Sequence, residues 1–183
     1  LRRDGSSTLS PGNRYFNYPA IGLGWNISEE KFMNGLDFVN DLKLRGGWGV
    51  SGNRNVGAYQ TLGGLSAGYY NFGTSSAGQQ LGYIVTNLPA PDLGWQSTSQ
   101  FDIGLEFGLW NKRLTGSIDY YHQKTKDILL SVLLPPSNGA GSTLKNLGKT
   151  EGKGLEISLS YDIFRNSKGF NWSTDLIYFF NRE

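Results

Sequence analysis

Hydrophobic and polar positions alternate along residues 100–124, and this alternation predicts two β-strands joined by a tight turn. Successive side chains of a strand point to opposite faces, so each strand has one apolar and one polar face. The apolar positions are Phe101, Ile103, Leu105, Phe107 and Leu109 before the turn and Leu114, Ile118 and Tyr120 after it. Asn111 and Lys112 interrupt the pattern where the turn is expected.

Four further segments alternate in the same way, which brings the expected number of strands to six. They are residues 15–27, 42–51, 154–164 and 170–180. The last segment is less regular, because Ile177 and Phe179 fall on its otherwise polar face. All six are long compared with the usual length of a globular strand, which is about 5–6 residues.

The connections between these segments are of two kinds. Strands three and four are joined by the tight turn, strands five and six by the short "RNSKG", and strands one and two by a stretch in which Ser28 is expected to start a helical turn. In contrast, residues 53–94 and 131–150 form long connections rich in Gly, Ser and Asn or containing Pro. Short links at one end of a sheet and long loops at the other are typical of outer-membrane β-barrels.

The aromatic residues favour the same interpretation. Aromatic rings accumulate at the two membrane–water interfaces of a barrel, where they form girdles. The rings expected near the short-turn end are Trp25, Trp110, Phe164 and Trp172. Those expected at the other end are Tyr15, Tyr18 and Trp95.

Composition excludes several classes of protein. The 183 residues include no Cys, which rules out disulfide scaffolds, Cys-ligated zinc and thiol catalysis. The formal net charge of +2 gives no reason to expect a nucleic-acid partner. No apolar run is long enough for a membrane helix, but the strands of a barrel are only half apolar and would show no such run.

Alternation alone leaves two architectures open. In a soluble β-sandwich, for example one that binds carbohydrate, the apolar face is buried in a core. In a membrane barrel that face contacts lipid and the polar face lines a wet lumen. Strand length, loop asymmetry and aromatic placement favour an all-β, antiparallel transmembrane barrel. Six strands are too few to close one, so we expect residues 1–183 to be part of a larger barrel.

Charged residues at polar-face positions are the expected lumen lining of such a barrel. They are Lys43, Arg45, Asp102, Glu106, Asp119 and Glu156. The pattern shows no carboxylate pair with the spacing that glycoside hydrolysis requires. His122 is the only histidine, so no histidine-based metal cluster is expected. We therefore predict no enzymatic activity, no cofactor and no metal site.

The first long connection carries exposed-loop aromatics. Aromatic side chains on loops often bind ligands or partner proteins. The candidates are Tyr69, Tyr70, Phe72 and Tyr83. Stacking on a sugar and contact with a partner protein both remain open for them, as does packing within the loop itself.

Five stretches resemble, in the same order, segments of the SusC/RagA-type TonB-dependent transporters of Bacteroidetes. They are "RRDGSSTLSPGNRYFNYPAIGLGW", "LKLRGGWGVSGN", "PAPDLGWQSTSQFDIGLEFGL", "RLTGSIDYYHQKTKDILL" and "NLGKTEGKGLEISL". Each stretch alone is weakly specific, but five in order cover nearly all of the chain. Gly94 and Gly152 depart from the pattern, because a polar or charged residue is expected at each position.

The resemblance implies a barrel of roughly 22 strands with a plugged lumen, located in the outer membrane of a Gram-negative cell. It also implies import of large nutrients, glycans or peptides, driven by TonB and assisted by a SusD-like surface lipoprotein. Nothing in residues 1–183 resembles the plug domain through which TonB would act. A passive porin-type barrel is the alternative that retains the same wall.

Overall fold

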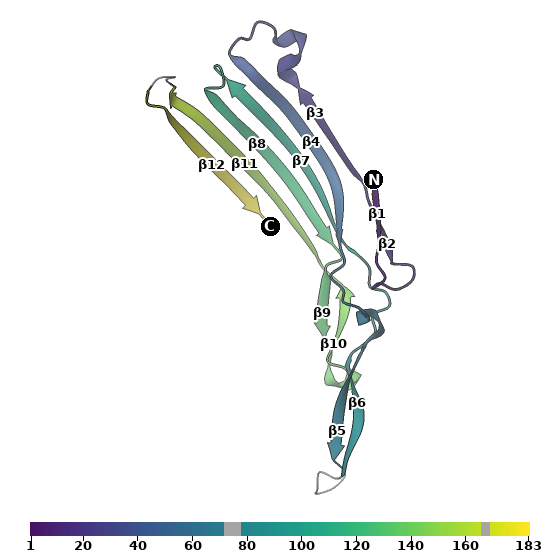
Figure 1. Ribbon diagram of the computed structural model, residues 1–183. Helices are drawn as coiled ribbons and strands as arrows, with labels where there is room; N and C mark the ends of the chain where they lie inside the picture. The colour runs from purple at the N-terminus through teal and green to yellow at the C-terminus, as the bar shows by residue number, and fades with distance from the viewer. Residues whose placement is uncertain (72–77, 166–168) are drawn as a thin grey trace. The chain divides into compact units, whose positions relative to one another are not determined.

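The computed structural model describes residues 1–71, 78–165 and 169–183, and most of these lie in β-strands, which pair antiparallel except for one parallel contact (Figure 1). The chain divides into two compact units, each assembled from three separate stretches of sequence. Unit 1 comprises residues 1–18, 51–97 and 125–149, and unit 2 comprises residues 19–50, 98–124 and 150–183. Unit 1 contains the long connections, whereas unit 2 contains the short ones.

Unit 2 is organised around a six-stranded sheet with the order β12-β11-β8-β7-β4-β3. The strands are β3 (Ala20–Asn26), β4 (Val39–Asn53), β7 (Gln96–Leu109), β8 (Leu114–Lys126), β11 (Lys149–Phe164) and β12 (Trp172–Arg182). Strands that are consecutive among these six are neighbours in the sheet, so the sheet is a simple meander with β3 and β12 as its end strands. The four inner strands, β4, β7, β8 and β11, are 13 to 16 residues long, which confirms the expectation of long strands for these four.

The short connections also follow the prediction. Trp110, Asn111 and Lys112 have φ values of 53°, 57° and 60°, and this left-handed run makes the tight reversal between β7 and β8. Between β3 and β4 lie two 3₁₀ helices, η1 (Ile27–Glu29) and η2 (Lys31–Met33), where the helical turn was expected. The Trp25 indole nitrogen donates a hydrogen bond of 2.9 Å to Glu30 and ties this connection to the end of β3.

Unit 1 contains two smaller sheets. β1 (Arg2–Gly5) pairs with β2 (Tyr15–Tyr18). The other sheet has the order β5-β6-β10-β9, with β5 (Gly64–Asn71), β6 (Gln79–Asn87), β9 (Leu129–Leu133) and β10 (Ser142–Asn146). The described residues of unit 1 also form the 3₁₀ helices η3 (Gln60–Leu62) and η5 (Pro136–Asn138). The two long connections are therefore largely β-hairpins, a regularity that their Gly- and Ser-rich composition did not predict.

The first expected strand, residues 15–27, is wrong as a single element. Pro19 separates β2 from β3, and the two halves pair with different partners, β1 and β4. A proline has no backbone N–H and fits poorly inside a strand. Its carbonyl still accepts a hydrogen bond of 2.9 Å from the Val50 amide, so the chain enters the large sheet directly after it.

A small hydrophobic core lies in unit 1. It is formed by the buried residues Leu9, Val56, Ala90, Leu93 and Trp95, with Phe16, Tyr18, Leu129 and Leu144 packed against them. The rings of Tyr18 and Trp95 meet edge-to-face at 6.2 Å, and Trp95 is only 8% exposed. Of the three aromatics expected in the outer girdle, Trp95 is instead buried in this core and Tyr18 packs half-buried against it, whereas Tyr15 is 66% exposed.

Candidate functional site

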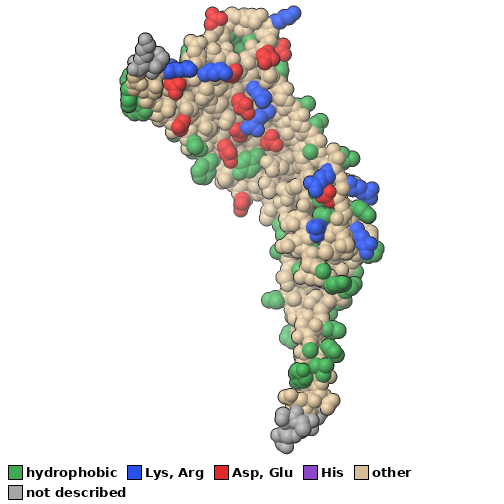
Figure 2. All heavy atoms as spheres, in the orientation of Figure 1, with side chains coloured by type: hydrophobic (Ala, Val, Ile, Leu, Met, Phe, Trp, Pro, Cys, Tyr) green, Lys and Arg blue, Asp and Glu red, His purple; other side chains and the backbone are tan. Residues whose placement is uncertain are grey.

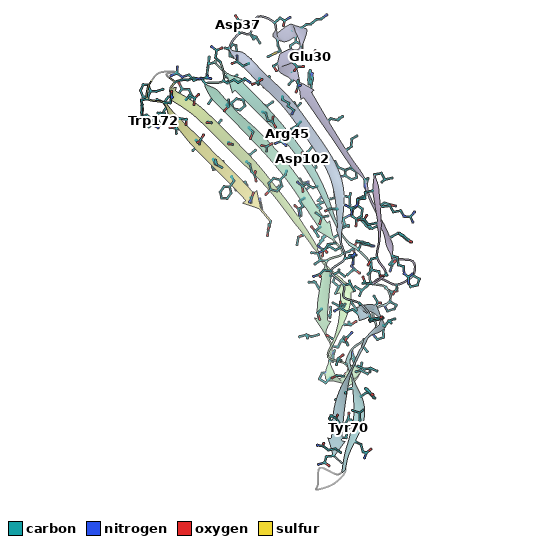
Figure 3. The ribbon with its side chains drawn as sticks, viewed as in Figure 1. Glu30, Asp37, Arg45, Tyr70, Asp102 and Trp172 are labelled. Carbon is teal, nitrogen blue, oxygen red and sulfur yellow. The ribbon has the colours of Figure 1, made fainter. Side chains whose placement is uncertain are left out.

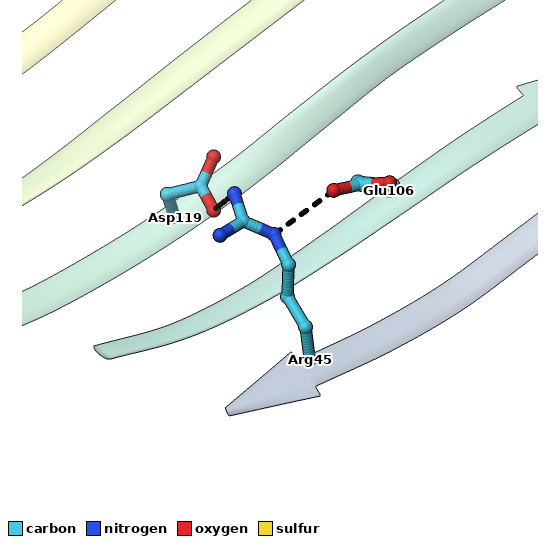
Figure 4. A network of polar contacts seen from close by, with 3 residues as sticks. All are labelled: Arg45, Glu106 and Asp119. Atoms are coloured by element: carbon cyan, nitrogen blue, oxygen red, sulfur yellow. Dashed lines mark hydrogen bonds and ion pairs between the residues drawn. The ribbon is translucent and has the colours of Figure 1, made fainter. Parts of the chain in front are cut away.

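The polar face of the six-stranded sheet carries a three-residue charge network (Figure 4). Arg45 on β4 places its Nε 2.9 Å from a carboxylate oxygen of Glu106 on β7 and one terminal nitrogen 2.6 Å from Asp119 on β8. The side chains of Arg45, Glu106 and Asp119 are 42%, 46% and 25% exposed, so the network is partly hydrated. One guanidinium thus connects three adjacent strands: it donates a charge-assisted hydrogen bond to Asp119, whereas its Nε is close to Glu106 without making a hydrogen bond.

Glycines on the same face make room for this network. The path of Arg45 from β4 to Asp119 crosses β7 at Gly104, where a Cβ atom would collide with the Asp119 carboxylate and the Arg45 guanidinium. A Cβ at Gly47 would lie 3.1 Å from an oxygen of Asp102. The alternation of glycine with charged residues, visible in the sequence, therefore has a packing reason: long charged side chains lie flat over positions that lack a side chain.

All six predicted lumen-lining residues fall on this one face. Lys43 lies opposite Asn26 in the β3–β4 register, and Arg45 lies opposite Gly24. Glu156 lies opposite Phe179 on β12. Figure 3 shows Arg45 and Asp102 on neighbouring strands of the sheet, and Figure 2 shows acidic and basic side chains spread over its visible face. Lys43, Asp102 and Glu156 form no ion pair with any described residue, so the structure gathers the six on a surface but only three in a network.

The opposite face is apolar and exposed. Ile21 is 62% exposed, Leu23 75% and Leu176 58%, although all three are large hydrophobic residues. Among the described residues of unit 2 no hydrophobic side chain is buried, because every buried hydrophobic residue belongs to unit 1. A sandwich would bury this face against a second sheet. The described part of unit 2 offers no second layer, which argues against the soluble sandwich.

Aromatic side chains gather at the short-connection end of the sheet, as predicted. Trp25, Trp110, Phe164 and Trp172 are each about half exposed, between 47% and 55%. The rings of Phe164 and Trp172 stack at 6.2 Å across a bulge in the β11–β12 register. Figure 3 labels Trp172 at the start of β12. This arrangement suits an interface where rings contact both apolar and polar surroundings.

The loop aromatics lie on the β5–β6 hairpin. Tyr69 and Tyr83 share one face, where the register pairs Tyr69 with Leu81 and Tyr83 with Ala67, and they are 72% and 67% exposed. Tyr70 lies on the other face, as its ring covers Gly82. Phe72 lies outside the described residues. The four predicted aromatics are therefore not one cluster, and the pair that shares a surface is Tyr69 with Tyr83.

The division of charge between the units was missed by sequence reasoning. Unit 1 is basic, with Arg2, Arg3, Arg14, Arg54, Lys126, Lys145 and Lys149 against Asp4, Asp92 and Asp127. Unit 2 holds the other twelve of the fifteen acidic residues. The overall charge of +2 conceals this separation, because each unit is assembled from three distant stretches. Residues 53–94 carry one basic and one acidic residue and residues 131–150 carry two lysines, so the long connections alone show only part of this excess.

The described residues include neither a membrane-spanning apolar helix nor a group of three or more His, Asp or Glu side chains placed to hold a metal ion. His122 lies 2.7 Å from Glu151, and Lys124 also contacts that carboxylate, at 3.3 Å. This histidine therefore belongs to a small surface ion cluster on β8 and β11.

Comparison with known proteins identifies the family. The family model for the TonB dependent receptor-like β-barrel matches residues 1–182. TonB-dependent receptor P39 of Formosa agariphila is 37% identical over 181 residues, which are 99% of this chain and 17% of that protein. TonB-dependent receptor SusC of Bacteroides thetaiotaomicron is 37% identical over 187 residues, covering 97% of this chain and 18% of that protein. The chain thus spans less than a fifth of the length of these relatives.

Solved structures agree with the sequence comparison. The RagAB peptide importer in its closed-closed state superposes with a TM-score of 0.85 at 29% identity, covering 98% of this chain and 19% of that chain. The siderophore receptor PirA from Pseudomonas aeruginosa, at a TM-score of 0.57 and 15% identity, shares the fold alone. The meandering sheet, its apolar outer surface and its charged opposite surface are therefore a portion of an outer-membrane barrel wall, and the chain belongs to the TonB-dependent receptor-like β-barrel family.

Proposed function

We propose that this chain forms part of the wall and outer loops of a transporter that imports glycans or peptides across the outer membrane, driven by TonB. One observation carries the proposal: most hydrophobic side chains of the sheet lie on one face, none of them buried among the described residues, while the other face holds a partly exposed charge network. Contact with lipid removes the apolar face from water, and a water-filled lumen solvates the charged face. The residues of this chain have a structural rather than a catalytic role in that activity.

In this proposal the short connections face the periplasm and the long connections face the cell exterior. Lys43, Arg45, Asp102, Glu106, Asp119 and Glu156 line the lumen, where they contact water and the plug domain supplied elsewhere in the full-length protein. The Arg45 network joins three strands and keeps that surface rigid without closing it to water. A SusD-like surface lipoprotein is the proposed partner at the outer end, as the likeness to SusC and to RagAB supports.

Uptake tests the import function. A strain producing the full-length protein is expected to take up its glycan or peptide nutrient, and to lose uptake when tonB is deleted or the plug domain is removed. Uptake that continues without TonB would refute energised import and would favour the passive barrel. Cell-surface levels of the barrel, measured in parallel, show that the loss is not caused by failed assembly.

Substitutions on the Tyr69–Tyr83 face of the β5–β6 hairpin test the proposed binding of the lipoprotein or nutrient. No charged residue occurs between Asn55 and Pro91, and Leu65, Tyr69, Leu81 and Tyr83 form a neutral apolar strip on one face of the hairpin. The double change Tyr69→Ala and Tyr83→Ala is expected to weaken binding of the lipoprotein or nutrient by about tenfold or more. Tyr59→Ala is the matched control, since Tyr59 is 77% exposed and lies outside the hairpin. Equal binding by both variants would remove the hairpin from the proposal.

A further inference from the structure

A polar hollow of about 510 Å³ lies within unit 1 and takes no part in the features described so far. Three stretches line it: residues 3–5 of β1, residues 52–55 at and after the end of β4, and the two aromatic residues Tyr18 and Trp95. All of these residues belong to unit 1. The hollow therefore exists within one compact body.

One arginine of the hollow has no carboxylate partner. Asp4 is the only acidic residue of the lining, and Arg2 neutralises it with contacts of 2.7 and 2.8 Å. Arg54 is exposed and forms no ion pair with any described residue. Arg3 also lines the hollow, but its guanidinium lies over the Tyr15 ring at 4.7 Å, on the face of the β1–β2 pair opposite Asp4 and Tyr18. The charged side chains of unit 1 that Figure 2 shows are mostly basic.

A buried donor in the same hollow lacks an acceptor. Trp95 is 8% exposed, yet its indole nitrogen has no hydrogen-bond partner among the described residues. Buried donors normally have an acceptor, and no described residue supplies one to this N–H. The hydrophobic core fixes the ring in place, because Phe16 and Tyr18 pack against it at 5.9 and 6.2 Å.

The Tyr18 phenol adds a second donor whose position is set by a glycine. Its ring lies so close to Gly52 that a Cβ there would be 2.9 Å from the hydroxyl oxygen. Burial raises the pKa of Tyr18, and Asp4 adds to the rise, so the hydroxyl stays protonated at neutral pH. Asn53 and Asn55 contribute amides to the rim.

We propose that this hollow binds a carboxylate group of the imported nutrient, held by the Arg54 guanidinium with the Trp95 indole N–H as a further donor. A carboxylate is planar and accepts two parallel hydrogen bonds from one guanidinium, which neutral hydroxyls cannot match. The inference rests on the proposed import function, because it names a chemical group of the substrate. The carboxylate has two possible sources, an acidic sugar or the end of a peptide, and the experiment separates them.

Binding is measured by calorimetry on the purified full-length protein, independently of transport. The probes are N-acetyl-trialanine and trigalacturonic acid, each compared with its neutral counterpart, N-acetyl-trialanine amide or trigalactose. One of the two acids is expected to bind at least about tenfold more tightly than its neutral counterpart. Its affinity is expected to fall as the salt concentration rises. The acid that binds identifies the source, whereas failure of both to bind a folded protein would overturn the site.

Variants locate the binding. Arg54→Gln is expected to weaken binding of the acid about tenfold or more. Trp95→Phe keeps an aromatic ring but removes the N–H, and it is expected to weaken that binding several-fold. Lys149→Gln is the control, since it removes one charge from unit 1 outside the hollow. Equal affinity of Arg54→Gln and wild type would overturn the proposal. TonB-dependent uptake without carboxylate binding refutes this site alone, and carboxylate binding with TonB-independent uptake refutes the import mechanism alone.

Discussion

Adjacent residues of β11 provide a direct test of which face meets lipid. Ile157 lies opposite Tyr178 on the apolar face, and Glu156 lies opposite Phe179 on the charged face. Glu156 forms no ion pair with any described residue, so its replacement breaks no contact of that kind. We predict that Ile157→Lys damages the barrel severely and that Glu156→Lys does not, although the same side chain is introduced one position away in the same strand.

The size of the effect follows from the depth of Ile157. It is seven residues from Phe164, one of the aromatics at the short-connection end. With about 3.3 Å per residue and a strand tilt of about 45°, that distance is about 16 Å along the membrane normal, close to half of the roughly 30 Å hydrocarbon thickness. A lysine at mid-membrane costs about 2–4 kcal/mol, which is a factor of about 30 to 1,000 in the folding equilibrium. Lysine at position 156 remains in water and is expected to change stability by less than about 1 kcal/mol.

The assay is urea unfolding of the full-length protein in phosphatidylcholine vesicles, followed by tryptophan fluorescence and by the mobility of the folded form on gels. The result that refutes the facing assignment is equal tolerance of the two variants, or greater damage from Glu156→Lys. If both variants fail, Glu156→Gln distinguishes a local charge effect from an intolerant strand, because it keeps the shape of the side chain.

The remaining predictions concern the charge network and its supporting glycines. Arg45→Gln should destabilise the barrel by about 1–2 kcal/mol, since two partly exposed ion pairs are lost. A double-mutant cycle with Asp119→Asn in the same urea assay should show a coupling energy of at least about 0.5 kcal/mol. Strictly additive effects of the two changes would mean that the Arg45–Asp119 contact contributes nothing to stability. Gly104→Ala should cost about 1–3 kcal/mol because its methyl group displaces Arg45 and Asp119, whereas Gly24→Ala, whose Cβ meets only the flexible Lys43 side chain at 3.8 Å, should change stability by no more than about 0.5 kcal/mol. Similar melting temperatures for the two alanine variants would contradict the packing role of Gly104.

The regular part of the fold was predictable because each strand carries its own alternation. Leu155, Ile157 and Leu159 show the apolar face of β11 without reference to any other strand. The turn at Asn111 and Lys112 was visible because it interrupts a pattern that resumes directly afterwards. Local signals of this kind survive in a single sequence.

The irregular part depends on contacts between distant stretches and was not predictable. Tyr18 and Trp95 are far apart in sequence, and nothing local shows that their rings pack together with Leu9 and Leu93 in a core. The hairpins of the long connections were hidden because Gly and Ser weaken the strand pattern. The charged residues of the candidate site were assigned to the correct face by alternation, but the Arg45–Asp119 contact depends on how two strands align across a third.

The two end strands of the meander have a consequence for assembly. β3 and β12 each pair with only one neighbour in the described sheet, so along their outer edges the N–H and C=O groups of every second residue lack a partner there. Hydrocarbon offers such groups neither donor nor acceptor. Strands of this kind therefore cannot insert into a bilayer one after another. Their unpaired edges must first be hydrogen-bonded to neighbouring strands, or shielded by a folding catalyst, before the sheet contacts hydrocarbon.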